Sequence, residues 1–253
     1  MKIWNKIKNW RQPRLYWKNI FKYYADQFSF QKSSVKIIKP GQEKSVLVLC
    51  PHIDDDVIGL GGTLYQYRQL GVPVTVIYFT TENERRKKEG ESIRDFLGYK
   101  ETKFYDFQPE QLSHYPDISA LLESFLKKNS FDVIYTPFHL DRHKDHIALA
   151  LHLAKALERI PELNAEIRCY EVWSPLFPNQ IVDISDVVEF KRKGILICQS
   201  QMESVNYVDL ALSLNRYRGI TSTREKQMAY AEAFYSCTPY AYLKLLKIEN
   251  PEK

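Results

Sequence analysis

The chain has 253 residues, of which 44% are hydrophobic and 26% are charged, a composition typical of a globular protein with one or two domains. This composition excludes a disordered chain, a collagen-like repeat and a coiled-coil rod. No apolar run approaches the roughly 20 residues of a membrane-spanning helix, and the first residues lack the apolar stretch of a secretory signal. We therefore expect a cytoplasmic protein.

The net charge of +5 is concentrated at the N-terminus. Residues 1–30 contain seven Lys or Arg side chains and one Asp, so the rest of the chain is nearly neutral. A protein that binds nucleic acid would carry a basic face on its folded body. We therefore expect no nucleic-acid partner.

Residues 1–43 are predicted to form a basic, aromatic N-terminal arm. Its apolar and aromatic residues recur at helical spacing on both sides of Pro13, with cations between them. Two interpretations remain open. The aromatic stripe packs on the protein's own body or on a second subunit, or residues 1–30 make a peripheral contact with the inner face of an anionic membrane, where each cation contributes about 1 kcal/mol. Residues 31–44 fit a linker or a short edge strand.

From Ser45 onward the chain alternates short β-branched and aromatic segments with helical patterns. Strands are predicted at residues 45–51, 72–80, 102–107, 131–137 and 167–173. Helices are predicted at residues 59–70, 84–97, 117–128 and 143–159, followed beyond Pro175 by a helix over 182–200 and two further helical stretches. This alternation predicts the α/β class, as a Rossmann-like three-layer sandwich with a mostly parallel sheet.

An acidic cluster follows the first strand of the predicted sheet. Residues 51–56 read Pro-His-Ile-Asp-Asp-Asp, and ligands of open α/β sheets bind beyond the carboxyl ends of the strands. The three carboxylates repel one another unless a divalent cation joins them, and His52 completes a mixed set of ligands. A helix N-terminus that favours acids is the alternative, but it accounts for only one or two of these side chains. The sequence therefore predicts a metal site at this turn.

Three glycines after the acidic cluster invite comparison with a nucleotide-binding loop. A dinucleotide loop requires G-x-G-x-x-G, whereas the sixth position of the segment that begins at Gly59 is Leu64. The neighbouring carboxylates would also repel a pyrophosphate. The glycines instead predict a helix that begins close against the sheet.

A histidine-rich segment follows the fourth predicted strand. Three of the six histidines, His139, His143 and His146, lie within eight residues, and His143 and His146 share one face of a helix. Asp145 is suited to accept an imidazole N–H and fix its tautomer. Because both clusters emerge at the same sheet edge, we expect them to share one ion, Zn²⁺ with an open position for water or Fe²⁺, which suits two histidines and a carboxylate equally well.

Several of these segments together resemble the PIG-L/LmbE-like family of metal-dependent N-deacetylases. The resemblance covers roughly residues 45–236 and rests on PHIDDDVIGLGGTL, DRHKDH, LNRYRG, YAEAF and the helix pattern from Arg86 to Gly98. It implies an enzyme domain over residues 44–253 that removes an acyl group, usually acetyl, from an amino sugar or a related glycoside. The candidate substrates are a sugar nucleotide, an N-acetylglucosaminyl small molecule and a lipid-linked glycan. The aromatic, basic arm favours the lipid-linked class, as in glycan or surface polysaccharide biosynthesis.

The resemblance also implies roles for individual residues. The zinc ligands are His52, Asp55 and His146. Asp54 is the general base, His143 stabilises the oxyanion or protonates the amine, and Asp145 orients a histidine.

The resemblance also implies that Arg86 contacts the sugar. Four further candidates for the substrate pocket are Tyr207, Asn215, Arg216 and Arg218, although a surface role fits each of them equally well.

The sequence departs from the family pattern at two positions. The family usually has Pro after the first His and Glu as the last acid of the motif, where this chain has Ile53 and Asp56. Neither change removes a metal ligand or the base, so we expect an active enzyme. Two alternatives remain: a non-catalytic sugar-binding or membrane-tethered protein on the same fold, and another metal hydrolase such as a phosphoesterase.

Overall fold

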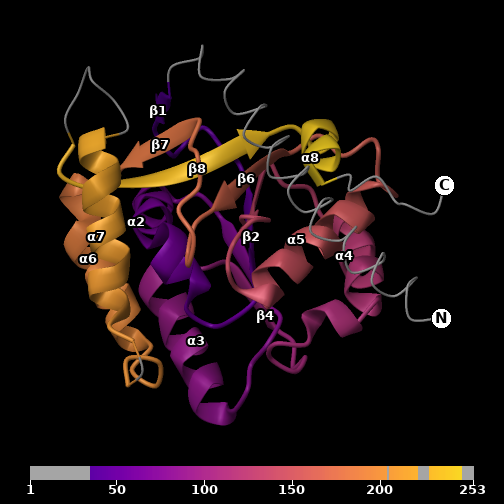
Figure 1. Ribbon diagram of the computed structural model, residues 1–253, viewed down its shortest axis with the longest axis horizontal. Coiled ribbons are helices and arrows are strands. Elements are labelled where there is room, and N and C mark those ends of the chain that lie inside the picture. Colours follow the sequence, from indigo (N-terminus) through magenta and orange to yellow (C-terminus); the bar gives the residue numbers. More distant parts are fainter. Residues whose placement is uncertain (1–34, 204, 222–227, 247–253) are drawn as a thin grey trace, which may run out of the picture.

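The computed structural model describes residues 35–203, 205–221 and 228–246. An eight-stranded sheet forms the middle layer, with helices on both of its faces (Figure 1). The predicted amphipathic segments of residues 1–30 lie outside the described residues, so both interpretations of the arm stay predictions.

The sheet is mostly parallel. Its spatial order is β1-β7-β8-β6-β5-β2-β3-β4, and only β8 runs antiparallel to its neighbours, β6 and β7. The strands are β1 (Lys36–Ile38), β2 (Val46–Cys50), β3 (Val74–Tyr78), β4 (Glu101–Phe104), β5 (Val133–Pro137), β6 (Glu166–Tyr170), β7 (Gln180–Asp183) and β8 (Ala231–Cys237).

The helices divide into two groups, one on each face of the sheet (Figure 1). One face carries α2 (Asp55–Leu70), α3 (Glu84–Leu97), α6 (Val188–Ile197) and α7 (Tyr207–Thr221). The other face carries α4 (Asp117–Lys128), α5 (Lys144–Leu157) and α8 (Pro239–Leu246). The α/β class and the Rossmann-like three-layer arrangement are confirmed.

The central strand β2 shows why the sheet needs both helical layers. Its five residues are all buried, and successive side chains point to opposite faces. Val46, Val48 and Cys50 pack in the core under α2 and α3, whereas Leu47 and Leu49 pack in the core under α4 and α5. A strand buried on both faces is continuously apolar, as parallel sheets require.

The predicted elements differ from the structure at one end of the sheet, where β7 and β8 lie. β7 occupies the first residues of the helix predicted over 182–200, and β8 is an additional strand beyond it. β7 has only four residues, too few for a period of two to be recognised. In β8 the buried Glu232 interrupts the apolar pattern. At the N-terminal side, β1 pairs with β7 and forms the edge of the sheet. The short edge strand, one of the two interpretations of residues 31–44, is therefore confirmed, and it lies within the range that we assign to the arm.

Helix α2 begins at Asp55, four residues before the predicted start, and is interrupted at Leu60, where φ is −144°. Glu232 of β8 accepts hydrogen bonds from the backbone N–H groups of Gly62 and Thr63, and Lys191 of α6 donates to the same carboxylate at 2.6 Å. This buried pair caps the second part of the helix. The first turn, which carries Asp55, is therefore a separate short segment against the sheet.

The strand order brings the two predicted metal-binding loops together. β2 and β5 are neighbours and parallel, so the turn after β2 and the loop after β5 emerge side by side at one sheet edge. The chain continues from β2 to β3 on one side and returns through β5 on the other, the arrangement in which open α/β sheets bind ligands. None of the helices in the described parts of the chain is long and apolar enough to cross a membrane.

Candidate active site

A cleft of about 220 Å³ lies at the carboxyl edge of the sheet. The loops that follow five adjacent strands line it, with His52 and Asp54 after β2, Arg86 after β3, Glu110 after β4, His143 after β5 and Trp173 after β6. All three non-glycine residues with positive φ in the described chain, Asp54, Glu82 and Glu110, also line this cleft. Backbone strain of this kind concentrates at functional sites.

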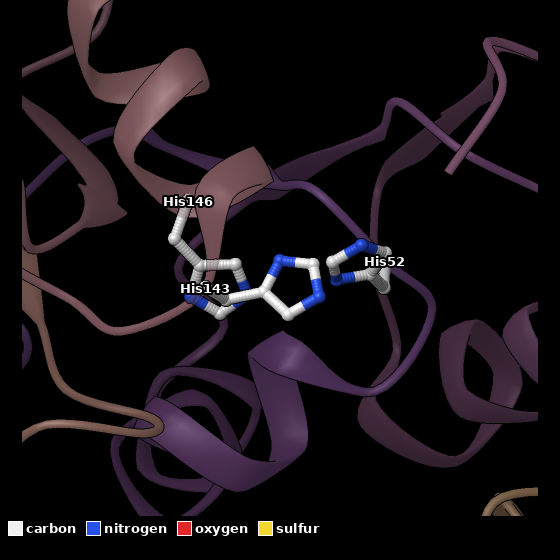
Figure 2. Close-up of side chains that lie close together, drawn as sticks. All are labelled: His52, His143 and His146. Carbon is white, nitrogen blue, oxygen red and sulfur yellow. The ribbon is translucent and has the colours of Figure 1, made fainter. Parts of the chain in front are cut away.

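Three histidines from the two predicted clusters converge in this cleft. One ring nitrogen each of His52, His143 and His146 lies within 4.8 Å of the other two (Figure 2). The imidazole centroids of His52 and His143 are 4.6 Å apart, and those of His143 and His146 are 5.0 Å apart. This group is of the kind that holds a metal ion.

Asp55, the first residue of α2, lies between two of the histidines. Its Oδ2 atom is 3.2 Å from Nδ1 of His52, and its Oδ1 atom is 3.2 Å from Nε2 of His146. The backbone N–H of His52 also donates to Oδ2 at 2.8 Å. Asp55 therefore contacts both histidines, each through a different carboxylate oxygen.

The spacing of these donors fits a bound metal ion. Neighbouring ligands of a tetrahedral ion with bonds of about 2.0–2.1 Å lie about 3.3 Å apart, close to the two distances that Asp55 makes. His146 is fully buried, and within the described residues neither of its ring nitrogens makes a hydrogen bond, although Asp55 and Asp141 lie at ion-pair distance. Because buried polar atoms are rarely left without a partner, Nε2 of His146 is suited to an ion.

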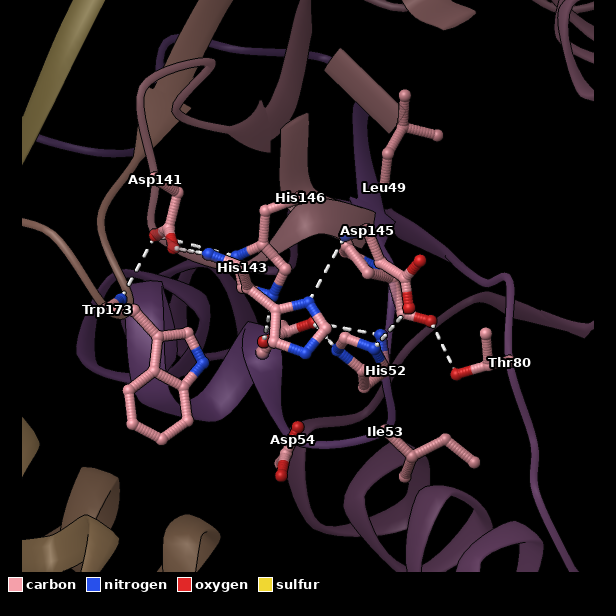
Figure 3. Close-up of polar contacts among 12 residues, drawn as sticks. Leu49, His52, Ile53, Asp54, Thr80, Asp141, His143, Asp145, His146 and Trp173 are labelled. Carbon is pink, nitrogen blue, oxygen red and sulfur yellow. Dashed lines mark hydrogen bonds and ion pairs between the residues drawn. The ribbon is translucent and has the colours of Figure 1, made fainter. Parts of the chain in front are cut away.

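Two carboxylates outside this set hold the histidines in place (Figure 3). Asp145 accepts from Nε2 of His52 at 3.1 Å and from two backbone N–H groups of the loop after β4. Asp141 lies 3.5 Å from Nδ1 of His146 and accepts from the backbone N–H of His143 at 3.0 Å. Carboxylates in such positions fix the orientation of metal-binding imidazoles.

The same carboxylates control the ionisation of the histidines. Burial acts to lower the pKa of His52, but its hydrogen bonds to Asp145 and Asp55 outweigh burial and raise that pKa to about 10. Burial is likewise outweighed at His146, where the charge of Asp55 and a contact with Asp141 raise the pKa to about 9. In turn, despite burial, His146 holds the pKa of Asp55 below its usual value. Without an ion, protons therefore balance the charge of the carboxylates.

Asp54 lies beside this group without joining it. Its backbone has φ 154° and ψ −22°, a conformation that L-residues rarely adopt. Its Oδ2 atom is 3.6 Å from Nη1 of the buried Arg86. Burial raises the pKa of the Asp54 carboxyl to about 7, although the charge of Arg86 opposes the rise. The carboxyl therefore titrates near neutral pH.

His143 differs from the other two histidines. It precedes α5, and its Nδ1 atom accepts a hydrogen bond from the backbone N–H of Asp145 at 3.2 Å. Nδ1 must therefore be unprotonated, which leaves the proton on Nε2. Burial and the neighbouring His52 lower the pKa of His143, so the neutral imidazole with an Nε2–H donor is its ordinary form.

Asp56, the shortened acid of the motif, points away from the cleft into the core. Its Oδ2 atom accepts hydrogen bonds of 2.6 Å from the hydroxyl groups of both Tyr78 and Tyr99. Burial raises the pKa of Asp56 despite these two bonds. The two tyrosine hydroxyls thus hold Asp56 in the core, although its side chain is shorter than the Glu that the family usually has.

Of the candidates from the sequence, Tyr207 lines the cleft, whereas four others lie apart from it. Arg218 donates to the buried carboxylate of Glu171. Asn215 is buried and donates to the backbone carbonyl of Ala231, and Arg216 donates to the carbonyl of Ala229. Both side chains hold α7 against the start of β8, so we do not retain them as substrate-binding residues. His139 is buried beside the Phe138 ring and is not part of the histidine group.

Several residues that line or support the cleft were not predicted as site residues. Four of them are Glu82, Glu110, Asp141 and Trp173. Asp141 belongs to the DRHKDH segment and has a recognisable signal, the acid two residues before the first histidine. The other three follow strands β3, β4 and β6, and their place in the cleft depends on the strand order.

Comparisons with known proteins agree with this geometry. Residues 47–157, which include both clusters, match the family PIG-L: GlcNAc-PI de-N-acetylase. A diacetylchitobiose deacetylase of Thermococcus kodakarensis is 26% identical over 213 residues, which covers 72% of this chain and 80% of that protein.

Solved structures share the fold. N,N'-diacetylchitobiose deacetylase from Pyrococcus horikoshii superposes with a TM-score of 0.67 at 23% identity, over 79% of this chain and 86% of that chain. A 4-carboxy-2-hydroxymuconate hydratase from Pseudomonas putida superposes with a TM-score of 0.61 at 19% identity, over 76% of this chain and 95% of that chain. Because the fold hosts a hydratase as well as deacetylases, the reaction must be argued from the site.

Proposed function

Because the chain belongs to the PIG-L family of metal-dependent N-deacetylases, we propose that it hydrolyses the acetamide of an N-acetylated amino sugar to an amine and acetate. The observation that carries this proposal is the convergence of His52, Asp55 and His146, with the separate carboxyl of Asp54 beside them. A metal site next to a carboxyl that titrates near neutral pH suits the hydrolysis of an amide.

We assign the metal to His52, Asp55 and His146. Two histidines and one carboxylate suit Zn²⁺, and Fe²⁺ also favours this set. When bound, such an ion supplies an activated water and polarises the acetamide carbonyl. His143 is the alternative third ligand, but its Nδ1 atom is already used by the backbone, and Asp55 lies at ligand spacing from both other histidines.

Asp54 is assigned as the general base. A base acts best when its pKa is near the working pH, and burial raises the pKa of Asp54 to about 7. Arg86, 3.6 Å away, favours the ionised form and limits the rise. After accepting a proton from water, the Asp54 carboxyl is suited to pass it to the departing amine.

His143 is assigned as the donor to the developing oxyanion. Its Nδ1 atom is occupied by the backbone N–H of Asp145, which leaves Nε2–H as the donor. A fixed donor of this kind contributes about 3 kcal/mol to stabilisation of the transition state. Nη1 of Arg86 is buried, lines the cleft and has no hydrogen-bond partner within the described residues, which supports its assignment to a sugar hydroxyl.

The volume of the cleft favours a small substrate group. Its volume of about 220 Å³ is below the range of about 300–1,000 Å³ of pockets for drug-sized ligands. One N-acetylated sugar residue is therefore the part of the substrate that enters, and the remainder lies outside. A conjugate of N-acetylglucosamine satisfies this requirement.

The test is a panel of N-acetylated sugars incubated with the zinc-loaded protein, with amine and acetate release measured together. The proposal expects stoichiometric release of both products from at least one N-acetylglucosamine conjugate, and loss of both after chelation. Hydrolysis of phosphate esters instead would identify a phosphoesterase. Binding of sugars without turnover would identify the non-catalytic alternative.

A lipid-linked substrate remains a finer proposal, supported by the basic and aromatic composition of residues 1–30. If this segment contacts a membrane, its deletion should weaken binding to anionic vesicles and leave hydrolysis of a soluble substrate unchanged. Vesicle binding that survives the deletion would contradict this role. Neutral vesicles serve as the control, since the attraction of cations requires anionic lipid.

A further inference from the structure

One wall of the cleft is aromatic and has no role in the proposed hydrolysis. Trp173, three residues after β6, and Tyr207, the first residue of α7, both line the cleft. Their rings meet edge to face with centroids 5.7 Å apart. Two elements far apart in the sequence thus present one continuous aromatic surface beside the candidate catalytic residues.

Both aromatic side chains keep an unused hydrogen-bond donor. Within the described residues, the indole Nε1–H of Trp173 and the hydroxyl of Tyr207 make no hydrogen bond. Buried Trp and Tyr side chains usually find a partner for these groups, and Tyr207 is only 8% exposed. Two aromatic rings with an available N–H and O–H donor suit a ligand that has an apolar face and hydroxyl groups.

The position of Trp173 is fixed relative to the histidines. Its backbone N–H donates to Oδ2 of Asp141 at 3.0 Å, and Oδ1 of Asp141 accepts from the backbone N–H of His143. One buried carboxylate therefore ties the loop after β6 to the loop after β5. Figure 3 shows the indole extending from this tie into the space beside His143 and Asp54.

We infer that Trp173 is the platform on which the sugar ring next to the scissile acetamide stacks, with Tyr207 completing the wall. The C–H face of a pyranose packs against the indole, and Nε1–H and the Tyr207 hydroxyl donate to ring hydroxyls. Trp173 is then a specificity-determining residue that selects glycosides over other acetamides. This inference rests on the proposed function and names its substrate-recognition element.

The first experiment compares steady-state kinetics on a chitooligosaccharide of N-acetylglucosamine for four full-length variants. Trp173→Ala should raise KM about tenfold or more, and Trp173→Phe, which keeps a ring but loses the donor, about threefold, with kcat changed less. Tyr207→Phe should raise KM about threefold. Tyr217→Phe is the matched control, because Tyr217 lies on the same helix and is 55% exposed, and its KM should not change.

The second experiment uses Trp173 as a reporter. The other tryptophans are Trp4, Trp10 and Trp17, so replacing these three with Phe leaves Trp173 as the sole indole. Its emission should change saturably on titration with N-acetylglucosamine and should not change with acetate alone. The inference would be overturned by three results together in an active wild-type enzyme. KM in both Trp173 variants would stay within twofold of the wild-type value, and the emission of Trp173 would not change on titration. An inactive wild-type protein that still shows the emission change would overturn the proposed hydrolysis and retain the platform.

Discussion

The Oδ2 atom of Asp145 lies 3.1 Å from Nε2 of His52, although 93 residues separate the two in sequence. The same carboxylate accepts from the backbone N–H groups of Glu110, at 2.5 Å, and Leu112, at 3.1 Å. Loops that follow three different strands therefore meet at one buried side chain. This contact holds the His52 imidazole so that Nδ1 faces Asp55.

Replacing Asp145 should consequently weaken metal binding without removing a ligand. Asp145→Ala frees the His52 ring, and losses of this kind lower metal affinity about 10- to 100-fold. Competition with a chromophoric chelator measures the change. Asp106→Ala, at an exposed position of the loop after β4, should leave the affinity at the wild-type value. An unchanged affinity in Asp145→Ala would show that His52 needs no such support.

Asp54→Asn should separate catalysis from metal binding. The substitution keeps the shape of the side chain and removes the proton acceptor, so kcat should fall about 10²- to 10⁴-fold. Bound zinc, measured by elemental analysis, should stay at the wild-type content. A near-normal rate in this variant would refute the assignment of the base.

His143 and His146 should respond differently to truncation. His146→Ala removes a ligand and should lose both zinc and turnover. His143→Ala should retain zinc and lower kcat about 10²- to 10³-fold, as expected for the loss of an oxyanion donor. Loss of zinc from His143→Ala would instead make His143 the third ligand in place of Asp55.

Zinc binding should release protons at neutral pH. The pKa of His52 is raised to about 10 and that of His146 to about 9, so without an ion both carry a proton at pH 7. Each must become neutral to bind, and about two protons should leave. Calorimetry in buffers of different ionisation enthalpy measures the number, and equal heats in all buffers would exclude this release.

The same two pKa values give the direction of the pH dependence. Apparent zinc affinity should increase as the pH rises towards 10, because fewer protons must then be displaced. The contribution of these histidines to the stability of the metal-free protein has the opposite direction. It is fully present below the unfolded pKa of about 6.5 and is lost as the pH rises through the raised values.

Lys191→Met should destabilise the fold. Glu232 and Lys191 are both fully buried, and removal of one partner leaves the other charge uncompensated, at a cost of about 3–5 kcal/mol. Denaturant unfolding measures the difference. Lys193→Met, at an exposed position of the same helix, is the control and should change the free energy of unfolding by less than about 0.5 kcal/mol. Equal stability of the two variants would mean that the cap on α2 contributes little.

Local patterns in the sequence were sufficient to predict the central sheet and the two loops that converge at the cleft. The apolar run of β2 and the acids after it indicate a strand and a ligand-binding turn within a few residues of each other. Helical spacing predicted that His143 and His146 share a helix face, but His143 precedes α5 with an extended backbone, and only His146 lies in the first turn of the helix. Strands β7 and β8 were missed because one is short and the other carries a buried charge, whose partner Lys191 is 41 residues away.

The α/β class, the parallel central sheet and the residue types of the candidate metal site could be predicted from the sequence alone, since each depends on periodicity or spacing within one segment. Three relationships became visible only in the folded chain: Asp55 lies between His52 and His146, Asp145 holds His52, and Trp173 packs against Tyr207 in the cleft. The sequence suggested Asn215 and Arg216 as substrate-binding residues, whereas in the fold both side chains bind backbone carbonyl groups at the start of β8. Strand order and the packing of α7 set which distant side chains meet, and neither can be read from a single segment.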